Sequence, residues 1–228
     1  MNNILYYFLL FLTYSVIGYI FECAYCTIRN KRLILNRGFL VGPYLPIYGS
    51  GAVLMVLFLS RYTRNAFVVF IMGALMATII EYITSFVMEL FFKARWWDYS
   101  KEKYNINGRV CLLNTTLFGI GGVVMMYLIN PVVLMALDNI NRTLLTIAGL
   151  VGIIIFAFDI FVSTSTIYKL RSSSIKINKE LPGEISTQLH TKLRKNKYFK
   201  KRLLNAFPNI KNIKVYNKIN EIIQSKNI

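Results

Sequence analysis

Four long apolar runs divide this sequence, and each is long enough to cross a lipid bilayer as a helix. A helix rises about 1.5 Å per residue, so about 20 apolar residues span a hydrocarbon layer of roughly 30 Å. The runs cover residues 4–28, 66–92, 111–137 and 143–168. The pattern therefore predicts an all-α fold, a polytopic transmembrane helical bundle.

A fifth apolar stretch, residues 39–60, is interrupted at its start by glycine and proline. Proline lacks a backbone N–H and clashes with the preceding helical turn, so a continuous helix from Gly38 is not expected. We predict an irregular start followed by a helix over about residues 46–60, which brings the bundle to about five spans. The residues that interrupt the stretch are Gly38, Gly42, Pro43, Pro46, Gly49 and Gly51.

The chain after the last run is strongly basic. From residue 169 onward it holds 15 Lys and Arg residues against three Glu, a net charge of +12 out of the +17 of the whole chain. Apolar side chains recur there at every third or fourth position, which predicts basic amphipathic helices. We divide the chain into a transmembrane domain, residues 1–170, and a cytoplasmic tail, residues 171–228.

Two interpretations of the tail stay open. A basic amphipathic helix beside a membrane suits anionic lipid headgroups or a soluble partner protein. The same stripe suits two helices that pack on each other under the membrane domain. Nucleic acid is not expected as a partner, because the tail contains no recognisable nucleic-acid-binding module.

The loops between the runs predict the orientation. Cytoplasmic loops of membrane proteins are enriched in Lys and Arg. The loops after the first and third predicted spans hold nine such residues, whereas the loops on the opposite side hold Arg61, Arg64 and Arg142. With five spans, this places the N-terminus outside the cell and the C-terminus in the cytoplasm.

Acidic residues inside the apolar runs are the clearest functional signals, because charge at membrane depth is costly and normally faces a cavity or a partner. At about 100° per residue, Glu22 and Glu81 each lie on a narrow polar stripe of their helix. Two facing stripes would line one site; alternatively, Tyr, Ser or Arg side chains satisfy two buried carboxylates. The stripes are Ser15, Gly18, Glu22 and Cys26, and Thr78, Glu81, Ser85 and Glu89.

Asp159 lies near the middle of the last run and is followed by four hydroxyl side chains, residues 163–166. A proton or cation relay and a hydrogen-bonded contact between helices both fit this pattern.

The loop between the third and fourth spans places Asp98 between Trp97 and Tyr99, with Arg109 further on. Aromatic residues and arginine are ordinary at the headgroup level. An acid in that setting indicates an ion pair with Arg109 or Arg95, or a bound ligand.

Several chemistries are excluded or disfavoured by the residues present. Cys23 and Cys26 have a CxxC spacing but neither the strand-to-helix setting of a redox motif nor further metal ligands, so no metal is expected. The single histidine, His190, lies in the tail, which argues against a Ser-His-Asp or Cys-His active site. No phosphate-binding loop occurs in the chain. No cofactor is predicted, and whether the chain is an enzyme stays open.

Several short motifs occur in a fixed order along the chain. They are Gly38-Phe39-Leu40-Val41-Gly42-Pro43, Pro46-Ile47-Tyr48-Gly49-Ser50-Gly51, Glu81-Tyr82, Trp97-Asp98-Tyr99-Ser100 and Gly108-Arg109-Val110-Cys111-Leu112. With these motifs, residues 5–135 resemble the bacterial membrane family labelled putative ABC-transporter type IV. The resemblance implies a permease-like protein of the bacterial cell membrane that works with a separate ATPase subunit. It supplies no substrate and no catalytic residue.

Three hypotheses follow for the function. The first is a permease-like or substrate-binding membrane component with a polar site inside the bundle, alone or as a homo-oligomer. The second is a membrane-embedded enzyme acting on a lipid or lipid-linked substrate, with a carboxylate as base and Arg109 holding a phosphate. The third is a scaffold that recruits a partner through its tail. The candidate substrate-binding residues are Glu22, Glu81, Asp98, Arg109, Trp97, Tyr99 and Tyr48.

Overall fold

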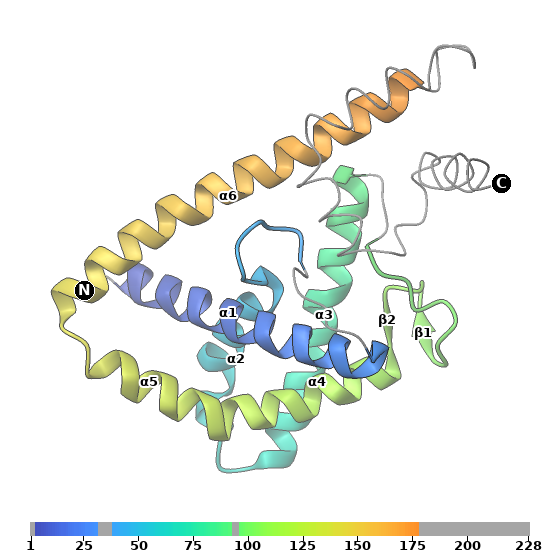
Figure 1. Ribbon diagram of the computed structural model, residues 1–228. Coiled ribbons are helices and arrows are strands. Elements are labelled where there is room, and N and C mark those ends of the chain that lie inside the picture. The colour runs from blue at the N-terminus through green and yellow to red at the C-terminus, as the bar shows by residue number, and fades with distance from the viewer. Residues whose placement is uncertain (1–2, 32–37, 93–95, 178–228) are drawn as a thin grey trace.

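The computed structural model describes residues 3–31, 38–92 and 96–177, and within them the chain is almost entirely helical (Figure 1). The α-helices are α1 (Asn3–Asn30), α2 (Pro46–Leu59), α3 (Ala66–Phe92), α4 (Leu112–Val124), α5 (Asn130–Asp138) and α6 (Arg142–Ile177). A 3₁₀ turn, Ser60–Tyr62, follows α2, and a π-helical segment, Met125–Ile129, joins α4 to α5. Strands β1 (Asn105–Ile106) and β2 (Val110–Cys111) pair antiparallel. The predicted all-α class is confirmed.

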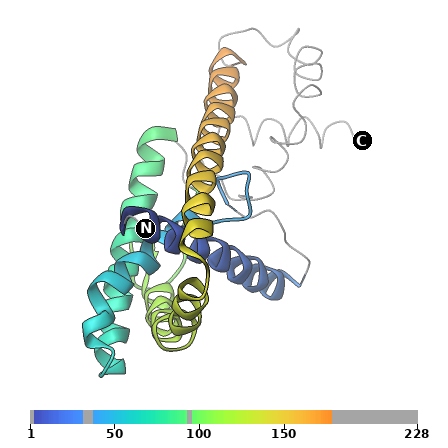
Figure 2. The same ribbon diagram turned by 90° about the vertical axis from the view of Figure 1, so that its left-hand side faces the viewer.

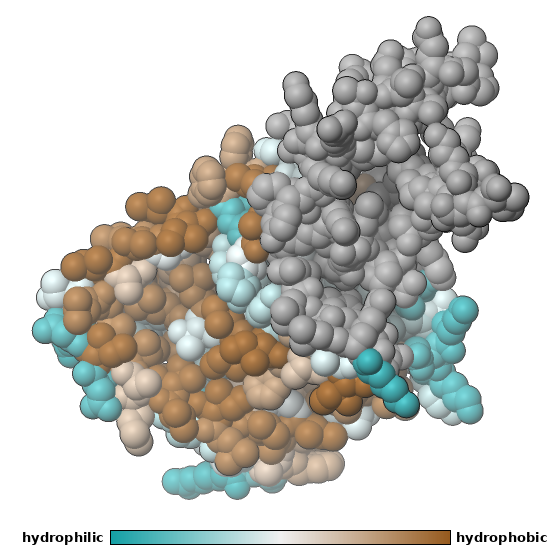
Figure 3. Space-filling view, in the orientation of Figure 1, coloured by the Kyte–Doolittle hydropathy of each residue, from teal (hydrophilic) through white to brown (hydrophobic). Residues whose placement is uncertain are grey.

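Four helical segments are long and apolar enough to cross a membrane: Asn3–Ile28, Ala66–Phe92, Leu112–Asp138 and Arg142–Thr166. They coincide with the four apolar runs of the sequence. Much of the surface of the described residues is hydrophobic (Figure 3), and on α6 the side chains of Ile154, Phe158 and Phe161 are 69%, 68% and 70% exposed. Exposed apolar side chains in such numbers require lipid as their solvent. The chain is a multi-pass membrane protein.

The stretch predicted as a further span has two parts. Helix α2 begins at Pro46, as predicted, but its 14 residues extend only about 21 Å, less than the roughly 30 Å of hydrocarbon. Before it lies an irregular segment, residues 38–45. The backbone N–H of Leu45 donates to the carbonyl oxygen of Ser15 over 2.9 Å, and Ser15 lies near the middle of α1. Helix α2 therefore starts halfway along α1, because the proline and glycine residues before it prevent a full-length helix.

Helix α1 contacts both α2 and α6, and α3 forms a hairpin with α4 (Figure 1). In that hairpin, Gly73 of α3 faces Gly122 of α4, and the hydroxyl oxygens of Thr78 and Thr115 are 2.9 Å apart. Small residues let two membrane helices approach closely, where dispersion contacts replace the hydrophobic effect as the attraction. The C-terminal part of α6 projects past the other described helices in both views (Figures 1 and 2).

Glycine also sets the contact between α1 and α2. A Cβ atom added at Gly49 would overlap the Ser15 hydroxyl and the backbone carbonyl of Phe11, and one added at Gly18 would overlap the ring of Tyr48. The side chain of Ser15 is fully buried in this contact. The close approach fixes the height of α2 against α1 and thereby the position of Tyr48.

Gly49→Ala is therefore expected to lower the free energy of unfolding by about 1–3 kcal/mol, the usual range for overpacking. The backbone carbonyl of Phe11 cannot move aside without distorting α1. Gly121→Ala is the matched control, since Gly121 is also inside a helix but has open space around it. It should be neutral or stabilise the protein by up to about 1 kcal/mol through helix propensity. Thermal unfolding in detergent would measure both, and equal effects would contradict the packing described here.

Helix α6 continues to Ile177, past the boundary predicted between the two domains. Residues 178–228 lie outside the described part of the chain. The amphipathic tail and its partners therefore stay predictions.

Candidate functional site

Glu22 of α1 and Tyr48 of α2 form the first half of a polar cluster. The Tyr48 hydroxyl donates to Glu22 Oε2 over 2.8 Å, and the thiol of Cys26 donates to Glu22 Oε1 over 3.3 Å. The ring of Tyr48 packs where Gly18 leaves room, one helical turn before Glu22. The close contact of the two helices thus brings the tyrosine to the carboxylate.

Glu81 of α3 and Tyr99 of the following loop form the second half. The Tyr99 hydroxyl donates to Glu81 Oε1 over 3.1 Å, and the Glu81 side chain is only 5% exposed. Tyr99 is held in place by its backbone N–H, which donates to the carbonyl of Gly108 over 2.8 Å. Asn107 and Gly108 both have positive φ angles and form the turn between β1 and β2. This turn folds the loop back beside α3.

The two halves belong to one site. Burial raises the pKa of the Tyr99 phenol well above its usual range, and the negative charges of Glu81 and then Glu22 raise it further. Tyr99 is therefore a protonated hydrogen-bond donor at neutral pH. The charges of both carboxylates act on the Tyr99 phenol, which links the two hydrogen-bonded pairs electrostatically. We call Glu22, Tyr48, Glu81 and Tyr99 the acid cluster.

One atom of the acid cluster has no hydrogen-bond partner. Glu81 Oε2 is buried, and no donor is bonded to it among the described residues. Buried polar atoms are normally paired, and an unpaired carboxylate oxygen in an apolar setting is costly. Such an atom needs an explanation, and an ion, a water molecule or a ligand that completes the site is one.

Arg109 contacts the same stripe of α3 as Glu81, but one and two helical turns further on, and it does not complete the acid cluster. Its guanidinium donates to Ser85 Oγ over 3.1 Å and forms an ion pair with Glu89 Oε2 over 2.8 Å. It also lies over the rings of Tyr82 and Phe86, at 5.7 and 5.4 Å from their centroids. Arg109 is thus engaged on several sides. With Phe86, Glu89 and Leu90 it borders an open groove of about 290 Å³.

Trp97 and Asp98 shape the loop that carries Tyr99. The Trp97 indole N–H donates to the carbonyl oxygen of Arg109 over 2.9 Å, which ties the two ends of the loop together. Asp98 Oδ1 accepts the backbone N–H of Ser100 over 3.0 Å and also the Ser100 hydroxyl. Such a bond to the residue two positions on stabilises a turn. The ion pair considered between Asp98 and Arg95 involves a residue outside the described ranges.

The structure therefore brings together four of the seven predicted residues, Glu22, Tyr48, Glu81 and Tyr99. Glu89, which the sequence placed on the same stripe as Glu81, is the partner of Arg109. This pairing cannot be predicted from the sequence, because the loop that positions Arg109 has too little regular structure to show a periodicity.

All four residues of the acid cluster fall inside one region that is shared with a known family. The family model described as "Putative ABC-transporter type IV" matches residues 9–164, which is more than half of the chain. The chain belongs to this family. No curated protein and no solved structure matches it. The family match also includes the irregular segment and Asp159.

Asp159 holds the irregular segment in place. Its carboxylate accepts the backbone N–H groups of Val41 over 2.8 Å and Gly42 over 2.6 Å, together with the hydroxyls of Tyr44 and Ser163. Backbone groups that a helix cannot satisfy need such partners inside a membrane. Of the two roles considered for Asp159, the structure shows the hydrogen-bonded contact between segments. Its partners could not be predicted, since the irregular segment lies far from Asp159 in the sequence.

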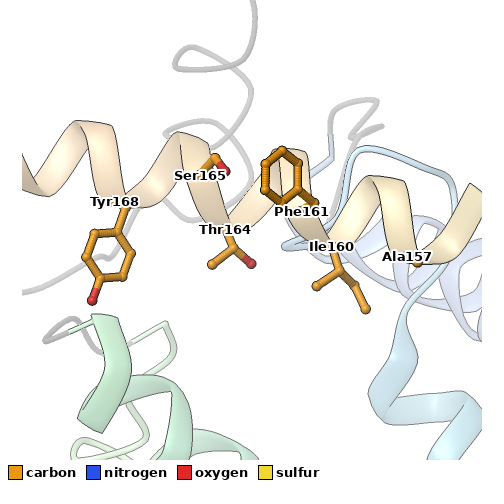
Figure 4. Close-up of a pocket in the computed structure, with 6 residues that line it drawn as sticks. All are labelled: Ala157, Ile160, Phe161, Thr164, Ser165 and Tyr168. Carbon is orange, nitrogen blue, oxygen red and sulfur yellow. The ribbon is translucent and has the colours of Figure 1, made fainter.

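A second groove, of about 420 Å³, lies along α6 (Figure 4). Its lining changes along the helix from apolar to hydroxyl-bearing side chains, and Tyr168 points from α6 toward α3. The lining residues are Ala157, Ile160, Phe161, Thr164, Ser165 and Tyr168. This groove is open and shares no residue with the acid cluster.

Proposed function

We propose that this chain is a permease-like membrane component that binds its substrate at the acid cluster. The observation that carries the proposal is the convergence of two carboxylates, from α1 and α3, with Glu81 Oε2 left unpaired. Charged groups at membrane depth are retained where they face a ligand path or a partner. A bound substrate would supply the missing hydrogen bond and offset the cost of burying Glu81.

The irregular segment supports this role. In many transporters the substrate site lies beside a helix broken near the middle of the membrane, where backbone groups and helix ends face the ligand. Here α2 starts halfway along α1, and Tyr48 in its first turn is already part of the acid cluster. Asp159 satisfies two backbone N–H groups of the irregular segment, so this break in the helix is stable within the bundle.

Energy for transport would come from a separate ATPase, because this chain has no phosphate-binding loop. The basic loops, predicted to face the cytoplasm, are the natural docking surface for such a subunit. The tail would then meet anionic lipid headgroups in the cytoplasm. An N-terminus outside the cell, as predicted, further requires that the irregular segment and α2 together complete a fifth crossing.

The geometry gives less support to the hypothesis of a lipid-modifying enzyme. That hypothesis uses Arg109 to hold a phosphate, but the guanidinium already bonds Glu89 and Ser85. The scaffold hypothesis depends on the tail, which lies outside the described residues.

Solute accumulation in membrane vesicles tests the proposal. Inverted vesicles from cells that express the chain together with its own genome's ATPases would be given ATP and a cell extract, and accumulated solutes would be compared by mass spectrometry. We expect at least one solute whose ATP-dependent accumulation falls at least about tenfold in Glu81→Gln, the scale of a lost charge-assisted contact. Glu102→Gln is the matched control, because Glu102 lies in the same loop as Tyr99 but outside the cluster. Identical solute profiles for wild type and Glu81→Gln, at equal membrane abundance, would refute the proposal.

A further inference from the structure

The charge balance of the acid cluster indicates the chemical class of its ligand. Each carboxylate is bonded by neutral donors: Tyr48 and Cys26 on Glu22, and Tyr99 on Glu81. Hydroxyl and thiol groups stabilise a carboxylate by hydrogen bonding but do not neutralise its charge. Arg109, the cation that packs on the same helix as Glu81, forms its ion pair with Glu89. The cluster thus joins two acids with no described cation bonded to either.

An anionic ligand is disfavoured at such a place. A carboxylate or phosphate brought between Glu22 and Glu81 would add a third like charge in a region shielded from water, where repulsion is strong. A neutral ligand would leave the burial of the charged acids uncompensated, so Glu81 would have to bind it in the protonated form. A cation reverses both effects, because it supplies the missing charge and a donor for Glu81 Oε2.

The kind of cation follows from the number of ligands. Calcium and magnesium ions take six or more oxygen ligands, commonly from several carboxylates. Among the described residues, no group of three or more His, Cys, Asp or Glu side chains could hold a metal ion. An ammonium group needs only hydrogen-bond acceptors in suitable directions, and it carries three N–H donors. The free oxygen of Glu81 and the remaining lone pairs of Glu22 and the two phenols are such acceptors.

We propose that the acid cluster binds a small molecule through a primary ammonium group, which donates to Glu81 Oε2 and lies between Glu81 and Glu22. This inference rests on the proposed substrate site and specifies what enters it. Cys26 and Tyr48 keep Glu22 in position, and Tyr99 orients Glu81 so that its second oxygen faces the ammonium.

Thermal unfolding of the full chain in lipid nanodiscs tests the ligand class, with methylammonium chloride as the probe. It would replace potassium chloride at constant ionic strength, and tetramethylammonium chloride would serve as a cation without N–H donors. We expect methylammonium to raise the unfolding temperature by a few degrees once it exceeds its Kd about tenfold. The rise should be absent in Glu81→Gln and intact in Glu102→Gln.

Three results would overturn the ammonium proposal. One is no rise with methylammonium in the wild type, including the case where only pH changes the unfolding temperature. Another is an equal rise of the unfolding temperature with tetramethylammonium, which would show a site for positive charge alone. A fall of the unfolding temperature when potassium is removed would likewise count against the proposal, because it would show a site for an alkali ion. The third is an equal rise in Glu81→Gln.

The vesicle experiment separates failure of this inference from failure of the proposed function. If Glu81→Gln abolishes solute accumulation but methylammonium has no effect on unfolding, the site stands and the ammonium class is wrong. If methylammonium binds at Glu81 while accumulation is unchanged, the ammonium site stands and the permease proposal is wrong.

Discussion

Asp159→Asn is expected to cause the largest loss of stability of any single substitution considered, about 3–5 kcal/mol in the free energy of unfolding. The substitution keeps the shape of the side chain but removes its charge and turns one acceptor into a donor. The N–H groups of Val41 and Gly42 and the Tyr44 hydroxyl all donate to this carboxylate. At least one of them would face an amide N–H and stay unpaired inside the bundle, where no water replaces the bond.

Asp138→Asn is the control for this prediction, because Asp138 is an exposed acid at the end of α5. It should change stability by less than about 0.5 kcal/mol, as surface substitutions usually do. Chemical or thermal unfolding in detergent measures both variants. If Asp159→Asn unfolded like Asp138→Asn, the hydrogen bonds to the irregular segment could not be what holds it.

Glu81→Gln is expected to show opposite effects on function and on stability. Binding should fall at least about tenfold, since a charge-assisted hydrogen bond to the substrate is lost. Stability without ligand should stay the same or rise by about 1 kcal/mol, because an unpaired amide is less costly to bury than an unpaired carboxylate. The glutamine carbonyl can still accept the bond from Tyr99.

This opposition distinguishes a binding residue from a structural one. If the Glu81 carboxylate has a structural role, neutralising it should lower the stability of the fold. If it serves to bind a ligand, its burial destabilises the ligand-free protein, and neutralising it should not lower stability. Unfolding temperature and ligand binding would be measured on the same preparation, with Glu102→Gln beside it. A clear loss of stability in Glu81→Gln alone would mean that Glu81 belongs to the structural network, and the proposed site would have to be abandoned.

The membrane spans could be predicted from the sequence because lipid imposes a simple rule on length and hydropathy. The start of α2 at Pro46 could be predicted as well, since proline is favoured in the first turn of a helix and excluded from its interior. The same rule does not predict the length of that helix. Whether residues 38–45 cross the membrane or are held inside the bundle depends on Asp159, more than 100 positions along the chain.

The acid cluster could be predicted in part. The spacing of Glu22 and Glu81 on their polar stripes predicts two facing helices. In the structure α1 and α3 each pack on α2, and the two carboxylates are joined through Tyr48 and Tyr99. Gly18, on the stripe of Glu22, marks where α2 approaches α1 and Tyr48 fits. Arg109 is a candidate from the sequence because it shares a loop with Asp98, but its guanidinium bonds Glu89 and Ser85 of α3 instead.

Native mass spectrometry of the chain, purified gently from its own host's membranes, can show whether the acid cluster holds a substrate. We expect a small molecule bound in a one-to-one complex with wild type and with Glu102→Gln, and its absence from Glu81→Gln. The same bound molecule at the same occupancy in all three proteins would show that the acid cluster is not the substrate site.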